Sequence, residues 1–307
     1  MRFFEDATQA VGRTPLVRIN RLCAGSKALV LAKLECFNPA SSVKDRVGLA
    51  IVDAAEASGE LKPGGTIVEA TSGNTGIALA WIGAARGYTV ILAMPETMTQ
   101  ERRGLLSALG AQLVLTPGSG GMAAAVAKAE EIAAATPGAI LARQFDNPAN
   151  PAAHRRTTAE EIWADTDGGV DIFVAGIGTG GTITGVGSAL KERKPAVKVV
   201  GIEPAESALL TTGKAGPHGI QGIGANFVPS ILDRSVLDEV LDIPTATAVT
   251  WARRLATEEG LFVGLSAGAA MAGAAEIAAR PESNGKTMVV IFPDAGDRYL
   301  STGLYSD

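Results

Sequence analysis

The sequence predicts an α/β fold of two open, twisted, mainly parallel sheets flanked by helices. Short β-branched runs alternate with Ala-rich stretches of helical periodicity, a rhythm typical of parallel βαβ units. The runs are continuously apolar, as expected of strands that helices cover on both faces. The chain has 307 residues, of which 47% are hydrophobic and 19% charged. Such a chain can bury a large core divided between two domains.

Each expected element follows from a local pattern. Strands are predicted for the apolar runs TIVEA at 66–70, TVILA at 89–93, AQLVLT at 111–116, DIFVAG at 171–176, VKVVGIE at 197–203 and MVVIF at 288–292. Helical periodicity covers residues 43–58, 122–135, 158–165, 181–193, 246–259 and 266–279.

One segment marks a change of domain. The sequence QFDNPANPAAH, residues 144–154, concentrates Asn and Pro between two βα series. We therefore expect an N-terminal domain over residues 41–148. Residues 1–40 precede the first complete βα series, and we expect them to join residues 149–307 in the second domain.

The charge balance excludes several classes of partner. A net charge of -5 and a pI near 5.3 leave no basic face for nucleic acid or anionic lipid. We expect small-molecule partners instead. The first residues lack the basic start and apolar run of a secretory signal, and no apolar stretch approaches the roughly 20 residues of a membrane span. The expected location is the cytoplasm.

Cysteine and histidine are too few to suggest a metal centre or a histidine-based triad. Cys23 and Cys36 have no neighbouring cysteine or histidine that would complete a metal site, and free thiols suit a reducing compartment. His154 and His218 are each isolated in the sequence. We expect structural roles for both histidines and no bound metal.

Glycine-rich turns open three helices, where backbone N–H groups and the helix dipole favour an anion. The first, TSGNTG at 71–76, combines three hydroxyls and an amide with glycines that admit a ligand close to the backbone. This composition favours a carboxylate as the ligand. The alternative is an ordinary N-cap turn, since Ser, Thr and Asn are the preferred capping residues. The third segment, GLSAGAA at 264–270, is the weakest and by itself predicts only a helix N-cap with a small-residue packing face.

The second turn, GIGTGGT at 176–182, allows two interpretations. It contains G-x-G-x-x-G at 176–181, and Glu203 lies about 20 residues further on, as in a dinucleotide-binding fingerprint. A nicotinamide-dependent oxidoreductase is therefore one hypothesis. That hypothesis leaves Thr179 and Thr182 unexplained, whereas their hydroxyls are suitable donors to a terminal phosphate. A phosphate monoester fits the turn better.

A lysine stands in the first turn of a predicted helix. The sequence NPASSVKDR at 38–46 predicts a turn, a serine cap and a helix start that contains Lys44. A cation there opposes the helix dipole, which favours the neutral amine that carbonyl chemistry requires. A solvated surface lysine beside Asp45 is the alternative.

Taken together, these segments resemble the cysteine synthase family, the O-acetylserine sulfhydrylases. The resemblance also includes GRTPLVRI at 12–19, QGIGANF at 221–227 and DRYLST at 297–302, so it covers nearly the whole chain. Residues 94–116 resemble the sulfide-using branch more than the thiosulfate-using one. The family belongs to the fold type II pyridoxal-phosphate enzymes, with a fold like that of the tryptophan synthase β-subunit.

The resemblance implies roles for individual residues. Lys44 would form the Schiff base with pyridoxal 5'-phosphate, Asn74 would hydrogen-bond the ring oxygen of the cofactor, and Ser266 would face its pyridine nitrogen. The phosphate would be held by Gly178, Thr179, Gly180, Gly181 and Thr182. The substrate carboxylate would be bound by Thr71, Ser72, Thr75 and Gln144. The N-terminal domain would thus carry the lysine and the carboxylate loop, and the second domain the phosphate loop and Ser266.

The implied reaction is β-replacement. O-acetyl-L-serine would lose acetate to give an aminoacrylate, and sulfide would add to form L-cysteine. The family also implies a homodimer and a partner in serine acetyltransferase, whose C-terminal tail would enter the active site. Two alternatives stay within the same chemistry: a cystathionine β-synthase-like condensation of serine with homocysteine, and use of O-phosphoserine. The nicotinamide oxidoreductase is the alternative from another class.

Three residues depart from the family's usual sequence. Asn226 replaces the second glycine of GAGF, Ala70 stands where proline commonly precedes TSGNTG, and Ala267 replaces a frequent serine after Ser266. The residues assigned to chemistry are retained. The departure at Asn226 leaves substrate preference less defined than reaction type.

Overall fold

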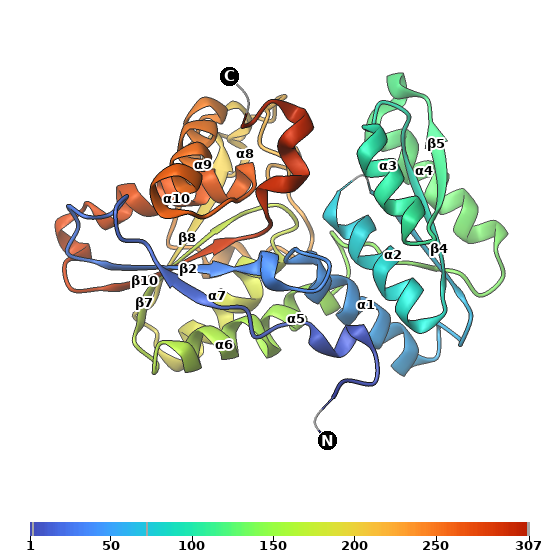
Figure 1. The fold of residues 1–307 in the computed structure, drawn as a ribbon, viewed down its shortest axis with the longest axis horizontal. Coiled ribbons are helices and arrows are strands. Elements are labelled where there is room, and N and C mark those ends of the chain that lie inside the picture. The colour runs from blue at the N-terminus through green and yellow to red at the C-terminus, as the bar shows by residue number, and fades with distance from the viewer. Residues whose placement is uncertain (2, 72, 306–307) are drawn as a thin grey trace. The chain divides into compact units, whose positions relative to one another are not determined.

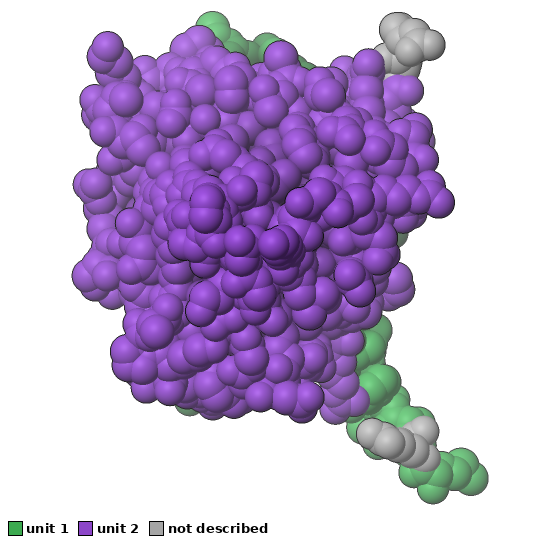
Figure 2. Space-filling view, turned by 90° about the vertical axis from the view of Figure 1, so that its left-hand side faces the viewer, with its two compact units in different colours: residues 1–11, 38–150 green, residues 12–37, 151–307 purple. Residues whose placement is uncertain are grey.

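The computed structural model describes residues 1, 3–71 and 73–305 and divides the chain into two compact units (Figures 1 and 2). Unit 1 comprises Met1–Val11 and Asn38–Asn150, and unit 2 comprises Gly12–Phe37 and Pro151–Asp307. The sequence assigned all of residues 1–40 to the second domain. In the structure only residues 12–37 group there, because Thr8 accepts hydrogen bonds at Oγ1 from the Arg86 guanidinium of unit 1, at 3.2 and 3.1 Å.

Unit 1 contains a parallel sheet of strands in the order β5-β4-β3-β6. The strands are β3 (Thr66–Ala70), β4 (Thr89–Pro95), β5 (Gln112–Thr116) and β6 (Ile140–Leu141). The helices are α1 (Lys44–Ser58), α2 (Asn74–Arg86), α3 (Gln100–Ala108) and α4 (Gly121–Ala135). Successive residues of β3 enter different cores: Ile67 packs with α1 and α2, and Val68 with Ala125 and Ala129 of α4. Helices on both faces explain why the strand is continuously apolar.

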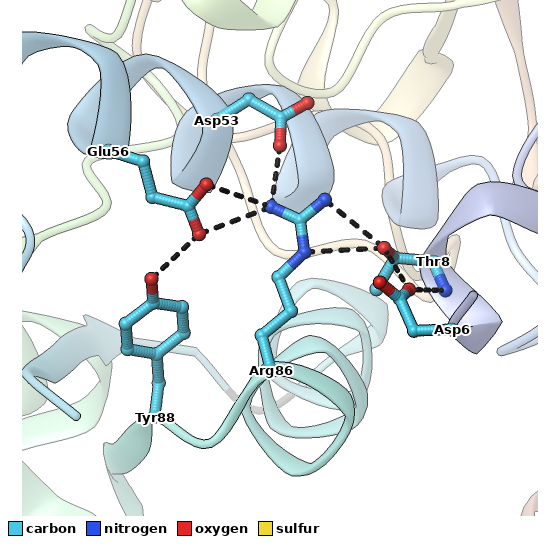
Figure 3. A network of polar contacts seen from close by, with 6 residues as sticks. All are labelled: Asp6, Thr8, Asp53, Glu56, Arg86 and Tyr88. Atoms are coloured by element: carbon cyan, nitrogen blue, oxygen red, sulfur yellow. Dashed lines mark hydrogen bonds and ion pairs between the residues drawn. The ribbon is translucent and has the colours of Figure 1, made fainter. Parts of the chain in front are cut away.

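A polar network joins the C-terminal ends of α1 and α2 (Figure 3). The Arg86 guanidinium donates to Asp53 at 2.6 Å and to Glu56 at 3.2 Å. The Tyr88 hydroxyl also donates to Glu56, at 2.7 Å. Because α1 and α2 begin at Lys44 and Asn74, the network lies at the ends of the two helices away from those residues.

Unit 2 contains a sheet in the order β1-β2-β10-β7-β8-β9, in which only β1 pairs antiparallel among the described strands. The strands are β1 (Leu16–Arg18), β2 (Leu29–Leu34), β7 (Val170–Gly176), β8 (Lys198–Pro204), β9 (Glu239–Ile243) and β10 (Thr287–Phe292). The helices are α6 (Thr158–Asp165), α7 (Gly181–Arg193), α8 (Leu209–Thr212), α9 (Thr245–Glu259) and α10 (Leu265–Ala278). In β7, Phe173 packs in the core with α6 and α7, and Val174 packs in the core with α9 and α10.

The predicted fold class is confirmed by two mainly parallel sheets with helices on both faces. Each of the expected strands and helices is present, with ends within two residues of the predicted ones. Helix α5 (Ala149–Arg156) begins within the Asn/Pro-rich segment 144–154. In the described part of the chain, no helix is long and apolar enough to cross a membrane.

Candidate active site

The start of α1 positions Lys44 in unit 1. Ser41 has a positive φ of 61°, and Asp45 is fully buried and accepts the Ala40 N–H at 2.6 Å. The Lys44 N–H donates to Ser42 Oγ at 3.2 Å, but the N-cap of α1 is Val43, which makes no side-chain cap hydrogen bond, and not the predicted serine. Asp45 and Ser42 therefore fix the turn from which the half-buried Lys44 side chain starts.

The loop after β3 leads directly into α2. The Thr71 N–H donates to Ala93 O at 3.1 Å, which extends the pairing of β3 with β4 by one residue. Thr71 Oγ1 accepts the Gly73 N–H at 3.2 Å, and Asn74 is the first residue of α2. Ser72, which the sequence also assigned to this loop, lies outside the described residues. The described part of the loop presents polar groups at a helix N-terminus, as an anion site requires.

Two further residues predicted from the sequence meet beside this loop. The Thr75 hydroxyl donates to Gln144 Oε1 at 2.6 Å, and both side chains are buried. The Asn150 amide donates to the backbone carbonyl of Gln144 at 2.9 Å. Pairing of β3 with β6 brings the two segments together, since Thr75 and Gln144 follow the carboxyl ends of these strands.

In unit 2, the turn between β7 and α7 is too closely packed for side chains at its glycines. A Cβ atom on Gly178 would lie 2.3 Å from Gly222 O, and one on Gly180 would lie 2.7 Å from Leu232 Cβ. Gly180 also has a φ of 82°, which L-residues rarely adopt. Thr179 Oγ1 accepts the Gly181 N–H at 3.3 Å. The packing thus requires glycine at 178 and 180 in the turn that leads into the N-terminus of α7, the kind of position where backbone N–H groups can bind an anion.

A histidine lies against the last residue of this turn. His154 is fully buried, with Nε2 3.2 Å from Thr182 Oγ1 and Nδ1 2.9 Å from Thr158 Oγ1. The sequence analysis gave His154 only a structural role and did not connect it with Thr182. The contact links α5 to α7 across 28 residues, so no local pattern indicates it.

Ser266 lies in the first turn of α10, beside the same loops. It is 3% exposed, and a Cβ atom on Gly222 would lie 3.9 Å from its Oγ. Gly222 is therefore close to both Ser266 and Gly178. The Gly264 N–H donates to Asp294 O at 3.1 Å, which fixes the segment that precedes the helix.

Glu203 does not provide the free carboxylate of a dinucleotide site. It is 3% exposed and accepts the N–H groups of Leu210 and Thr211 at 2.9 Å each. It also accepts the Thr211 hydroxyl at 2.7 Å. These bonds hold the N-terminal turn of α8, and they compete with any ribose for the same oxygens.

Among the described residues, no group of three or more His, Cys, Asp or Glu side chains could hold a metal ion. Cys23 and Cys36 are free and half-buried.

Comparisons with known proteins give consistent results. A family described as "Pyridoxal-phosphate dependent enzyme" matches residues 7–294. Cysteine synthase A of Escherichia coli is 50% identical over 315 residues, covering 100% of this chain and 97% of that protein. The structure of O-acetylserine sulfhydrylase isoform 3 from Entamoeba histolytica has a TM-score of 0.96 at 49% identity, covering 100% of this chain and 92% of that one. The structure of an O-ureido-L-serine synthase has a TM-score of 0.95 at 50% identity, with coverage of 99% and 96%.

Proposed function

The chain belongs to the cysteine synthase family of pyridoxal-phosphate-dependent enzymes, and we propose that it makes L-cysteine from O-acetyl-L-serine and sulfide with release of acetate. The observation that carries the proposal is 50% identity to a cysteine synthase over the whole chain. The retained lysine, carboxylate loop and phosphate loop support it.

The residues of unit 2 fit the cofactor. Pyridoxal phosphate carries a phosphate monoester, and Gly178–Thr182 offers two threonine hydroxyls and the backbone N–H groups at the N-terminus of α7. Ser266 offers a hydroxyl for the pyridine nitrogen. When bound, the cofactor supplies the electron sink for chemistry at the α-carbon of an amino acid. The protein supplies binding, orientation and proton transfer.

The residues of unit 1 would act on the substrate. Lys44 would hold the cofactor through Nζ and, once released, its amine would accept the α-proton as the general base. Asn74 would hydrogen-bond the ring oxygen of the cofactor. Thr71, Ser72, Thr75 and Gln144 would bind the substrate carboxylate, which orients the α-hydrogen towards Lys44.

Replacement of the lysine tests this assignment. We expect Lys44→Ala to lose the visible absorption of the lysine-bound cofactor and to lower turnover about 10³-fold or more, because both attachment and general base are removed. Circular dichroism should show an unchanged fold. Lys128→Ala is the matched control, since Lys128 is a partly exposed lysine of α4 whose ammonium group pairs with Glu131 at 2.7 Å. Wild-type turnover in Lys44→Ala would contradict the assignment.

A second candidate activity keeps the same site and changes the nucleophile or donor. The O-ureido-L-serine synthase is as similar in sequence as the cysteine synthase, at 50% identity. Asn226 departs from the family's usual glycine. Side-by-side assays of sulfide and hydroxyurea with O-acetylserine, of homocysteine with serine, and of sulfide with O-phosphoserine would decide between the activities.

Three further features are proposed from family resemblance. They are assembly into a homodimer, binding of the C-terminal tail of serine acetyltransferase, and a cytoplasmic location. The exposed side chains of Phe3 and Phe4, 68% and 54% accessible, are consistent with an interaction surface near the N-terminus. Analytical ultracentrifugation and titration with the tail peptide are the appropriate measurements.

A further inference from the structure

A buried carboxylate in unit 1 has no role in the reaction outlined above. Glu69 lies in β3, two residues before Thr71, and is 5% exposed. Burying a carboxylate is costly unless it is hydrogen-bonded, so its partners identify what it holds in place.

The partners of Glu69 form the corner that carries Gln144. Glu69 Oε2 accepts the Arg143 N–H at 2.8 Å. Arg143 has a positive φ of 51°, unusual for a residue other than glycine, and its carbonyl accepts the N–H groups of Asp146 and Asn147 at 2.9 Å each. The backbone and side-chain amides of Gln144 also lower the pKa of the Glu69 carboxylate, as nearby hydrogen-bond donors do. Glu69 thus stabilises a strained backbone turn at the end of β6.

The Thr75 hydroxyl defines the direction of the Gln144 amide, because it donates to the oxygen end. An ionised carboxylate only accepts hydrogen bonds, so it engages the N–H end of the amide. The oxygen end is then directed to another donor, and Gln144 Oε1 accepts the Thr75 hydroxyl at 2.6 Å. A chain of contacts therefore runs from the Thr75 hydroxyl to Gln144 and, through the N–H of the neighbouring Arg143, to Glu69.

We propose that Glu69 is a positioning residue for the substrate-carboxylate site, which it orders by holding the Arg143–Gln144 corner and the orientation of the Gln144 amide. This inference rests on the proposed function of Thr75 and Gln144. It explains why an acidic residue occupies an otherwise apolar strand.

The protonation equilibrium of Glu69 is compatible with this role. Burial raises the pKa of Glu69 to about 7 from 4.5, and the hydrogen bonds from Arg143 and Gln144 oppose that increase. The nearby Asp146 carboxylate raises the pKa further. The charged form that orients the amide therefore predominates only above about pH 7, and the Arg143 and Gln144 donors limit the increase.

The test compares Glu69→Gln with the wild-type holoenzyme. The new amide can present an N–H where the carboxylate only accepts, so the Gln144 amide loses its fixed direction. We expect KM for O-acetylserine to rise about tenfold, the size expected for a lost hydrogen bond to a charged group, with kcat changed less than about twofold. The visible band of the bound cofactor should be unchanged. Glu69→Asp keeps the charge and should restore part of the affinity, and it provides the test if Glu69→Gln does not fold.

Two further variants separate positioning from general stability. Glu56→Gln makes the same substitution in the network at the far ends of α1 and α2 (Figure 3), and it should leave KM unchanged. In a Gln144→Ala background, Glu69→Gln should raise KM for O-acetylserine by less than about twofold, because Glu69 acts through Gln144.

The outcomes distinguish this inference from the proposed function. A wild type that does not turn over O-acetylserine would overturn the proposed function and, with it, the role of Glu69. If the wild type is active and Glu69→Gln leaves KM unchanged, the role of Glu69 alone is overturned. The same follows if Glu69→Gln raises KM equally in the wild-type and Gln144→Ala backgrounds.

Discussion

Gly178 shows how a single residue shapes the phosphate loop. Its α-carbon packs so closely against Gly222 that an added Cβ would lie 2.3 Å from a backbone oxygen. A backbone atom cannot rotate away as a flexible side chain can, so the loop itself would have to move. The absence of a side chain is therefore a requirement of packing at this position.

We expect Gly178→Ala to lower the free energy of unfolding by about 1–3 kcal/mol, as overpacking of a close contact does, and to weaken cofactor binding. Urea unfolding and the visible absorption of the purified protein measure the two effects. Gly104→Ala is the control: no described atom lies within 4 Å of the added Cβ, and its position in α3 should make the variant more stable by about 0.5–1 kcal/mol. Equal stability of Gly178→Ala and wild type would contradict the packing argument.

Asn226 can be explained by backbone conformation. It has a φ of 62°, where glycine is favoured and Asn is the best tolerated of the other residues along with Asp. Its Oδ1 accepts the Ser207 hydroxyl at 2.6 Å. The substitution for the family's usual glycine thus preserves the turn and adds a hydrogen bond.

The residues that sequence analysis missed have partners far along the chain. Thr75 and Gln144 were predicted from resemblance, and the structure brings them into contact. Glu69 and His154 were not predicted as site residues, because their partners Arg143 and Thr182 lie 74 and 28 residues away. One signal for Glu69 was present in the sequence: an acidic residue in the otherwise buried run TIVEA requires a partner.

At the scale of elements, apolar runs predicted β3, β4, β5, β7, β8 and β10 but not β1, β2, β6 or β9. Strand β2, LVLAKL, was not predicted because Lys33 interrupts its apolar pattern. In the structure Lys33 is fully buried and pairs with Glu161 at 2.8 Å, and its Nζ donates to Thr14 O at 2.6 Å. Compensation of a buried charge by α6 depends on the tertiary fold, so propensity alone cannot reveal it.

An ion-pair network connects three elements of unit 2. Glu239 of β9 accepts hydrogen bonds from Arg280, which follows α10, at 2.8 and 2.9 Å. Lys198 of β8 pairs with the same carboxylate at 2.8 Å. The Arg280 hydrogen bonds, followed by those of Lys198, lower the pKa of Glu239 to about 2.

This depressed pKa predicts the pH dependence of stability. The contribution of Glu239 is fully present above its unfolded pKa of 4.5 and is lost as the pH falls towards about 2. We expect Glu239→Gln to lower the free energy of unfolding by about 1–2 kcal/mol at pH 7, after allowance for solvent screening, and by less at pH 3.5. Urea unfolding at both pH values measures the difference.

Glu192→Gln is the control for this prediction, because Glu192 pairs with Arg155 on the exposed surface. Glu192→Gln should change the free energy of unfolding only slightly at both pH values. A Glu239→Gln effect that grows as the pH falls would contradict the assignment.

At the scale of the whole molecule, the sequence predicted two α/β units and the structure contains two compact units. The domain change was expected within residues 144–154, and the boundary between the units, between Asn150 and Pro151, lies inside this segment. Residues 1–11 belong to unit 1 because of contacts such as that of Thr8 with Arg86, which no local sequence pattern specifies. Strand rhythm therefore predicts the units, whereas the path of the terminal segment follows from tertiary contacts.

The most direct test of the proposed function is the visible spectrum of the purified protein, recorded before and after addition of O-acetylserine and then sulfide. The account predicts a yellow protein whose absorption changes with O-acetylserine and returns when sulfide is added. That result would establish cofactor, donor and nucleophile together. A protein that stays colourless after incubation with pyridoxal phosphate, or a spectrum that O-acetylserine does not change, would contradict the account.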